Sequence, residues 1–152
     1  MINKLKRLLR PTMRIKHEGQ GPTYANENAA GLDIRAANEN PIMIQPGEWA
    51  DIPTELAVEI PEGYFGMVVP RSGLGFKYRL TLINDVGIID SDYRGNIGIR
   101  LLNEGTEPYM VLGGERVAQM IITPYTQVRL VRVASLTDSE RGSKGFGSTG
   151  RV

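Results

Sequence analysis

One acidic side chain, that of Asp90, lies at a position where a carboxylate could act in catalysis. Asp90 follows an apolar, β-prone run at residues 86–89 and precedes a polar, turn-prone stretch at residues 91–96. Its carboxylate can therefore face a cavity while its backbone stays in a strand ladder, and Tyr93 adds an amphipathic ring three residues later. Apolar residues on both sides, 86–89 and 97–102, predict a β-hairpin. An ordinary exposed hairpin with a solvated carboxylate is the alternative for this stretch alone. Three glycines permit close approach of a ligand to the backbone: Gly87, Gly95 and Gly98.

Two further stretches carry groups that could hold an anion. Arg71 and Ser72 precede a short predicted helix at residues 74–78, so a guanidinium, a hydroxyl and backbone N–H groups come together there. Residues 141–150 surround one aromatic ring, Phe146, with glycines, hydroxyls, an arginine and a lysine, which are suited to close over a phosphorylated ligand. A plain turn at the first place and a disordered tail at the second are the alternatives.

The composition excludes several kinds of site. The 152 residues include no cysteine and a single histidine, His17, which rules out thiolate zinc sites, cysteine nucleophiles and multi-histidine metal sites. Catalysis must then depend mainly on carboxylates, hydroxyls, lysines and arginines, and a metal would have oxygen ligands, which favours magnesium. The net charge of +1 gives no global field for nucleic acid, and no apolar run is long enough to span a membrane. We therefore expect a cytoplasmic protein with no membrane partner and no stable nucleic-acid partner.

The length predicts one domain, and its two ends differ from the middle. Residues 1–12 form a basic N-terminal extension, in which Pro11 ends an amphipathic run. Residues 13–134 form the main domain. Residues 135–152 are polar and glycine-rich, which predicts a flexible C-terminal tail.

The main domain is predicted to be all-β with one short helix. Short apolar segments, several of them alternating with period two, recur between glycine, proline and asparagine residues. Many short strands without long helices predict a sandwich, a barrel or a jelly roll. The expected strands, besides the first arm of the hairpin, lie at residues 13–16, 32–35, 42–44, 49–52, 56–60, 64–69, 80–83, 97–102, 109–112, 117–122 and 128–131.

Five pieces of the chain, taken in order, resemble the five motifs of the trimeric dUTP nucleotidohydrolases, the dUTPases. They cover nearly the whole chain, and the third and fifth are the most specific. Lys144 is a departure, because the family usually has a second glycine at that position before its phenylalanine. The five pieces are AAGLDIRA at 29–36, PRSGLG at 70–75, GIIDSDYRG at 87–95, GERVAQM at 114–120 and RGSKGFGSTG at 141–150.

The resemblance implies a jelly-roll-like dUTPase fold, a distorted β-barrel, assembled as a homotrimer with active sites at subunit interfaces. It implies hydrolysis of dUTP to dUMP and pyrophosphate with Mg2+, which keeps uracil out of DNA and supplies dUMP for dTMP synthesis. Asp90 would be the catalytic carboxylate, orienting and deprotonating a water for in-line attack on the α-phosphorus. Arg71 would also be catalytic, and Asp33 would reach the magnesium through water.

The resemblance also implies which residues bind the nucleotide. Asn84 and backbone groups near Ile88, Ile89 and Gly98 would recognise uracil. The Tyr93 ring would pack under the deoxyribose and exclude a ribose. Phe146 in the tail would cover the base. Besides Asp90, Tyr93 and Phe146, the expected substrate-binding residues are Arg71, Ser72, Gly73, Asn84, Gly87, Ile88, Ile89, Gly98, Gln119, Arg141, Gly147, Ser148 and Thr149.

Two other functions are weighed against dUTP hydrolysis. A dCTP deaminase shares the fold family, but the fifth motif here is of the dUTPase kind. A binding or regulatory module could keep the fold without the activity. The intact Asp90, Tyr93, Arg71 and Phe146 argue against a dead site, although they leave room for a second, protein-binding role.

Overall fold

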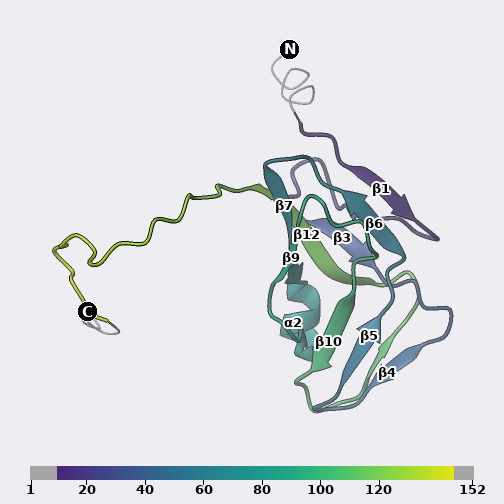
Figure 1. Cartoon of the computed structure of the whole chain (residues 1–152). Coiled ribbons are helices and arrows are strands. Elements are labelled where there is room, and N and C mark those ends of the chain that lie inside the picture. The colour runs from purple at the N-terminus through teal and green to yellow at the C-terminus, as the bar shows by residue number, and fades with distance from the viewer. Residues whose placement is uncertain (1–9, 146–152) are drawn as a thin grey trace.

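The computed structural model describes residues 10–145, which form a β-sheet protein with one short helix (Figure 1). Within these residues the single helix is α2 (Ser72–Tyr78). No helix in this part of the chain is both long and apolar enough to cross a membrane. The strands are β1 (Arg14–His17), β2 (Thr23–Tyr24), β3 (Leu32–Arg35), β4 (Ile42–Ile44), β5 (Trp49–Ile52), β6 (Leu56–Glu59), β7 (Tyr64–Pro70), β8 (Leu80–Leu82), β9 (Gly87–Ile89), β10 (Ile99–Asn103), β11 (Tyr109–Val111) and β12 (Arg116–Pro124).

Four antiparallel sheets surround one core, as expected for a jelly-roll-like fold. The largest has the order β2-β3-β12-β7-β9, and the second has the order β5-β10-β8. Two-stranded sheets, β11-β4 and β1-β6, complete the wall, so the strands of the described residues do not close into one continuous hydrogen-bonded barrel. The all-β prediction is therefore confirmed, with short sheets in place of a closed ladder.

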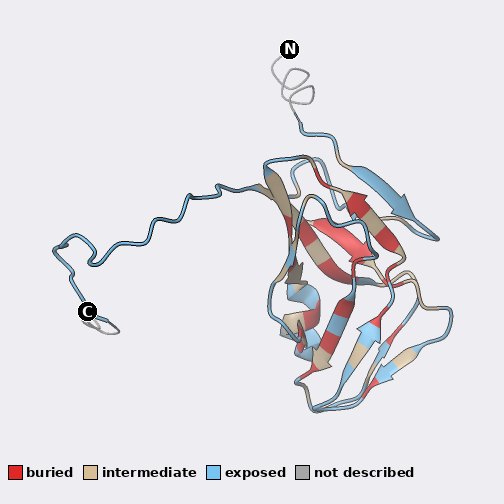
Figure 2. Cartoon of the chain, in the orientation of Figure 1, coloured by how far each residue is buried: buried red, intermediate tan, exposed pale blue. Residues whose placement is uncertain are grey.

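The central strand of the largest sheet is β12, which pairs with β3 on one side and with β7 on the other. Its residues Val117, Ala118 and Met120 are completely buried, and Figure 2 shows buried positions concentrated where the sheets face one another. Burying a side chain such as Val or Met stabilises a fold by about 1.5–3 kcal/mol. This strand therefore provides a rigid base for the polar residues at its beginning.

The predicted hairpin around Asp90 is wrong. Strand β9 pairs with β7 in the largest sheet, whereas β10 pairs with β5 and β8 in another. The two arms separate because Ile97, which follows the polar tip, is buried and its N–H donates to the carbonyl of Leu56 at 2.8 Å. Residues 90–98 therefore form a loop that passes from one sheet to another.

Two smaller predictions also need correction. Helix α2 begins at Ser72, two residues before the predicted start. Residues 128–131 form no strand, because they have no neighbouring strand in the described chain, and Leu130 is 89% exposed. Figure 1 shows the chain leaving the body of the molecule after β12.

Candidate active site

A cavity of about 170 Å³ lies between β9 and the start of β10. The two segments do not pair, yet they face each other across this space. Strand β9 is the outer strand of its sheet, so one of its backbone edges is available to a ligand. Five of the predicted substrate-binding residues line the cavity: Asn84, Gly87, Ile88, Ile89 and Gly98; the other lining residues are Val68, Leu82, Ile99 and Arg100.

Two of these lining residues, Asn84 and Arg100, are held by hydrogen bonds to other residues. The Asn84 side-chain amide donates to the Val86 carbonyl at 3.2 Å, which leaves its carbonyl oxygen without a partner among the described residues. Arg100 donates to both carboxylate oxygens of Asp51, at 2.7 and 2.8 Å, and its guanidinium lies 4.0 Å from the centre of the Trp49 ring. The hydrogen bond from Arg100 holds the pKa of the Asp51 carboxyl below its ordinary value. Arg100 is therefore fixed on the outer side of the cavity.

Asp90 stands at the end of β9, where the loop begins. It is exposed, and its carboxylate has no hydrogen-bond or ion-pair partner within residues 10–145. Its backbone carbonyl accepts from the N–H of Tyr93 at 3.2 Å, which closes a turn. A carboxylate that is free in this way can accept a proton from a water placed beside it.

The Tyr93 ring is held against its own loop. Its hydroxyl donates to the Asn96 carbonyl at 2.9 Å, and the ring remains 44% exposed. A side chain at Gly95 would collide with it, since a Cβ there would lie 2.7 Å from Tyr93 Cζ. The sequence suggested that Gly95 makes room for a ligand, but the structure shows that it makes room for the tyrosine. Part of the ring therefore stays open to solvent.

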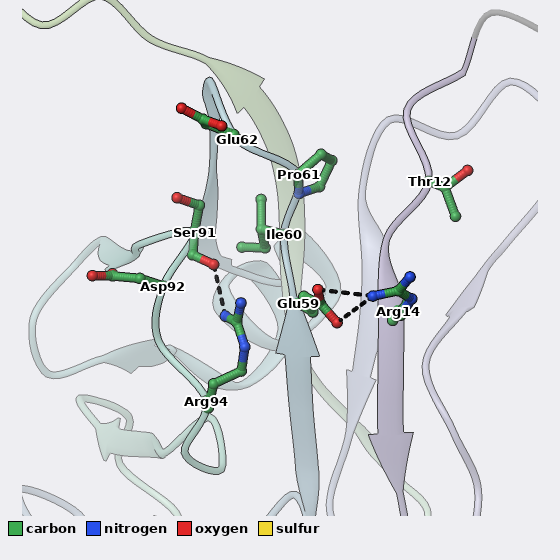
Figure 3. Close-up of a pocket in the computed structure, with 9 residues that line it drawn as sticks. All are labelled: Thr12, Arg14, Glu59, Ile60, Pro61, Glu62, Ser91, Asp92 and Arg94. Atoms are coloured by element: carbon green, nitrogen blue, oxygen red, sulfur yellow. Dashed lines mark hydrogen bonds and ion pairs between the residues drawn. The ribbon is translucent and has the colours of Figure 1, made fainter.

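Contacts on the far side brace the same loop. Arg94 donates to the Ser91 carbonyl at 2.7 Å, as Figure 3 shows, and to the Tyr93 carbonyl at 3.0 Å. These residues border a separate hollow of about 490 Å³, whose opposite wall carries the Arg14–Glu59 ion pair at 3.0 Å. The Arg94 guanidinium is engaged with backbone carbonyls, so it supports the loop.

The residue that ties this loop to the body was missed by sequence reasoning. Thr54 is buried, and its hydroxyl donates to the Ile97 carbonyl at 2.6 Å and accepts from the N–H of Leu56 at 3.3 Å. Beside it, the Asn96 amide donates to Glu55 at 3.2 Å. A single threonine after a proline carries no signal of such a role, because its partner lies 43 positions away.

A second polar cluster forms where β3, β7 and β12 lie side by side. Arg71 follows β7, and its Nε donates to Oδ1 of Asp33 at 3.0 Å. Arg116 begins β12, and its Nη1 donates to Oδ2 of the same carboxylate at 3.2 Å. Ser72 and Gly73 are exposed in the first turn of α2 beside Arg71. Arg116 lies within the fourth motif, but we assigned it no role from the sequence.

Gln119 belongs to this cluster through its position on β12. It lies opposite Asp33 on β3 and opposite Val69 on β7. Its side chain rests against the backbone of Gly31, where an added Cβ would lie 3.1 Å from Cδ of the glutamine and closer still to Oε1. Glycine at position 31 therefore has a steric reason within the chain.

Glu115, in the same motif, supports the fold behind this cluster. Tyr109 donates to its carboxylate, and the N–H of Leu112 donates to it at 3.1 Å. The Tyr109 ring also packs on Tyr78 at the end of α2, with 4.9 Å between ring centres. Burial, and then the hydrogen bond to Glu115, raises the pKa of the Tyr109 hydroxyl above its ordinary value.

The cavity beside Asp90 and the cluster around Arg71 are separate within one subunit. No hydrogen bond, ion pair or shared cavity joins them among residues 10–145. In the tail, Arg141 donates to the Lys144 carbonyl at 3.1 Å, on the segment that Figure 1 shows far from the body. The remaining predicted tail residues, Phe146, Gly147, Ser148 and Thr149, lie outside the described residues.

Comparison with known proteins gives a consistent result. The family model described as dUTPase matches residues 17–150. A deoxyuridine 5'-triphosphate nucleotidohydrolase of Rhizobium leguminosarum bv. trifolii is 46% identical over 149 residues, which cover 93% of this chain and 96% of that protein.

Solved structures point to the same family. The dUTPase of Staphylococcus bacteriophage 80alpha with dUPNHPP is similar at a TM-score of 0.81 and 32% identity, covering 91% of this chain and 98% of that one. A mutant dUTPase from phage phi11 of S. aureus, described with a structural Mg(II) ion, gives a TM-score of 0.73 and 27% identity over 82% of this chain and 97% of that one. With the motifs, the fold and these relatives in agreement, the chain belongs to the dUTPase family.

Proposed function

We propose that this protein hydrolyses dUTP to dUMP and pyrophosphate in the cytoplasm, thereby keeping uracil out of DNA and supplying dUMP for dTMP synthesis. One observation carries the proposal: the exposed Asp90 carboxylate, which has no partner among the described residues, follows directly on the strand that lines the 170 Å³ cavity. That arrangement can hold a base in the cavity and leave the sugar and phosphates beside the carboxylate.

The cavity suits a small pyrimidine base. Its volume of about 170 Å³ is enough for one pyrimidine ring, and the open edge of β9 offers N–H and C=O groups at fixed positions. The Asn84 carbonyl oxygen can accept from N3–H of uracil. Tyr93 would pack under the deoxyribose and leave no space for a 2′-hydroxyl.

In the proposed reaction Asp90 takes a proton from a water. The water oxygen forms a bond to the α-phosphorus, the bond from the α-phosphorus to the oxygen bridging to the β-phosphorus breaks, and pyrophosphate leaves with that oxygen. Arg71, Ser72, Gly73 and Gln119 would hold the phosphates, because their donors gather on one surface at β7, α2 and β12.

The separation of the two clusters supports a shared site in a homotrimer. A second subunit would supply the phosphate cluster to the cavity of the first. Arg141, Ser148 and Thr149 of a tail would cap the phosphates, and Phe146 would cover the base.

In this proposal magnesium is bound by the triphosphate and not by a cluster of protein side chains. Residues 10–145 contain no group of three or more histidine, cysteine, aspartate or glutamate side chains that could hold an ion. Both oxygens of Asp33, the expected contact through water, already accept from guanidinium groups.

The test is pyrophosphate release measured with dUTP, dTTP, dCTP and UTP. We expect turnover of dUTP alone at a substantial rate, and Asp90→Asn should lower kcat by at least roughly 10²-fold while nucleotide binding persists. Asp92→Asn is the matched control, because Asp92 borders the other hollow and should leave kcat nearly unchanged. Near-normal turnover by Asp90→Asn would remove this residue from the role, and formation of dUTP or dUMP from dCTP would indicate a deaminase.

A further inference from the structure

The connection between β5 and β6 holds one end of the loop at residues 90–98. The Thr54 hydroxyl donates to the Ile97 carbonyl at 2.6 Å. The N–H of Ile97 donates in turn to the Leu56 carbonyl at 2.8 Å. All three residues are buried, so these two bonds anchor the backbone of the loop to the core.

Between these two anchors, Glu55 has an unusual backbone conformation. Its φ is 49°, in the left-handed region that non-glycine residues rarely adopt, and among the described residues only Arg79 and Asp85 share this feature. Such a conformation raises the free energy of the folded chain, and it persists where the surrounding contacts fix it. Because glycine adopts this conformation without that cost, the side chain of Glu55 is the feature to explain.

The Glu55 side chain bonds to the loop itself. Its carboxylate accepts from the Asn96 side-chain amide at 3.2 Å. The backbone carbonyl of the same Asn96 accepts from the Tyr93 hydroxyl at 2.9 Å, and this is the one hydrogen bond of the Tyr93 side chain within residues 10–145. Asn96 therefore joins Glu55 to the tyrosine ring, and the direction of that ring depends on where Asn96 lies.

We propose that Glu55 is a positioning residue for sugar selectivity, which fixes Asn96 and through it the direction of the Tyr93 ring. The inference rests on the proposed function, since the ring distinguishes deoxyribose from ribose only if it packs under the sugar of dUTP. Without the carboxylate, the Asn96 end of the loop gains freedom, the ring moves with it, and space for a 2′-hydroxyl opens. Asp90 keeps its place, because it follows directly on β9, which pairs with β7.

The test is the UTP/dUTP ratio of kcat/KM in Glu55→Gly. Glycine removes the carboxylate but suits the positive φ, so Tm should change little. The ratio should rise about two- to tenfold, the effect of one lost hydrogen bond, while kcat for dUTP changes by less than about twofold. Glu55→Gln should keep most of the wild-type ratio, because its amide carbonyl can still accept from Asn96. A wild-type ratio in Glu55→Gly, or a ratio in Glu55→Gln as high as in Glu55→Gly, would overturn the proposal.

Asn96→Ala tests the same link from the other side. It removes the amide but keeps the backbone carbonyl that accepts from Tyr93. The ratio should rise as in Glu55→Gly, and the double variant should show no more than the larger single effect, because both changes break the same bond. Effects that multiply in the double variant would mean that the two side chains act independently, which contradicts the link.

Arg79→Gly is the matched control. Arg79 also has a positive φ, of 55°, directly after α2, and within residues 10–145 it has no hydrogen bond to the loop at 90–98. The same substitution there should leave the ratio unchanged, and a rise equal to that in Glu55→Gly would refute a specific role of Glu55. A wild-type chain that hydrolyses UTP as readily as dUTP would instead refute the proposed function. Selective hydrolysis by the wild type and equal selectivity in Glu55→Gly would refute only the inference about Glu55.

Discussion

Two glycines in one loop should respond to the same substitution in opposite ways. Gly95 lies against the Tyr93 ring, where an added Cβ would be 2.7 Å from Cζ, while a Cβ at Gly98 has no atom of the described chain within 4 Å. Neither glycine has a positive φ, so alanine fits the backbone at both positions. Any difference between Gly95→Ala and Gly98→Ala must then come from what surrounds the new methyl group.

The magnitudes follow from these contacts. Alanine for glycine at a compatible φ stabilises by about 0.4–1 kcal/mol through the unfolded chain. At Gly95 this gain is outweighed by overpacking, about 1–3 kcal/mol, and by loss of the 2.9 Å bond from Tyr93 to the Asn96 carbonyl, about 0.5–1.5 kcal/mol. The net loss of about 0.5–4 kcal/mol lowers Tm by roughly 1–16 °C in a chain of this size.

The assay combines thermal unfolding with substrate selectivity. Gly95→Ala should lower Tm and raise the UTP/dUTP ratio of kcat/KM, because the displaced Tyr93 ring no longer excludes the 2′-hydroxyl. Gly98→Ala should keep or slightly raise Tm but weaken dUTP binding, since its methyl group enters the cavity that would hold the base. A Gly95→Ala variant with unchanged Tm and an unchanged ratio would refute the assigned contact, and full activity in Gly98→Ala would refute the assigned cavity.

Three further predictions address other parts of the molecule. Gly31→Ala should push the Gln119 side chain away and raise KM for dUTP several-fold with little change in kcat, and an unaltered KM would remove that contact from the site. Because the pKa of Tyr109 is higher in the folded state than its unfolded value of about 10, its stabilising contribution is complete below that pH and is lost as pH rises above it. The fall in Tm between neutral and alkaline pH should therefore be shallower in Tyr109→Phe, and identical slopes would contradict this. Refolding Asp90→Asn together with a chain ending at Ser139 should restore activity in roughly a quarter of sites if carboxylate and tail come from different subunits, whereas mixed trimers no more active than the separate variants would exclude a shared site.

The sequence was sufficient for the family, most strands and five of the nine residues that line the cavity. Burial alternates with period two along β6 and β10 because one face of each strand must be apolar to reach the core. The resemblance to the family assigned Asn84, Ile88 and Gly98 to one ligand, and the structure brings them to one cavity.

Only the tertiary structure determines which residues distant in the sequence pair or form hydrogen bonds with each other. Local pattern suggested that the segments flanking Asp90 pair with each other, yet they enter different sheets because Ile97 is drawn into the core beside Leu56. The role of Thr54 could not be predicted from the sequence either, because it depends on a carbonyl 43 positions away.

Charged residues and glycines show most clearly that the sequence alone does not reveal contacts between distant residues. Residue type identifies Asp33 as an acid but not its companions, and only the packing of β3, β7 and β12 surrounds it with Arg71 and Arg116. Gly95 and Gly98 are the same residue three positions apart, yet one meets a tyrosine and the other open space. Neighbouring residues determine the local conformational preference of the backbone. The surroundings of a side chain depend instead on which distant segments the fold brings beside it.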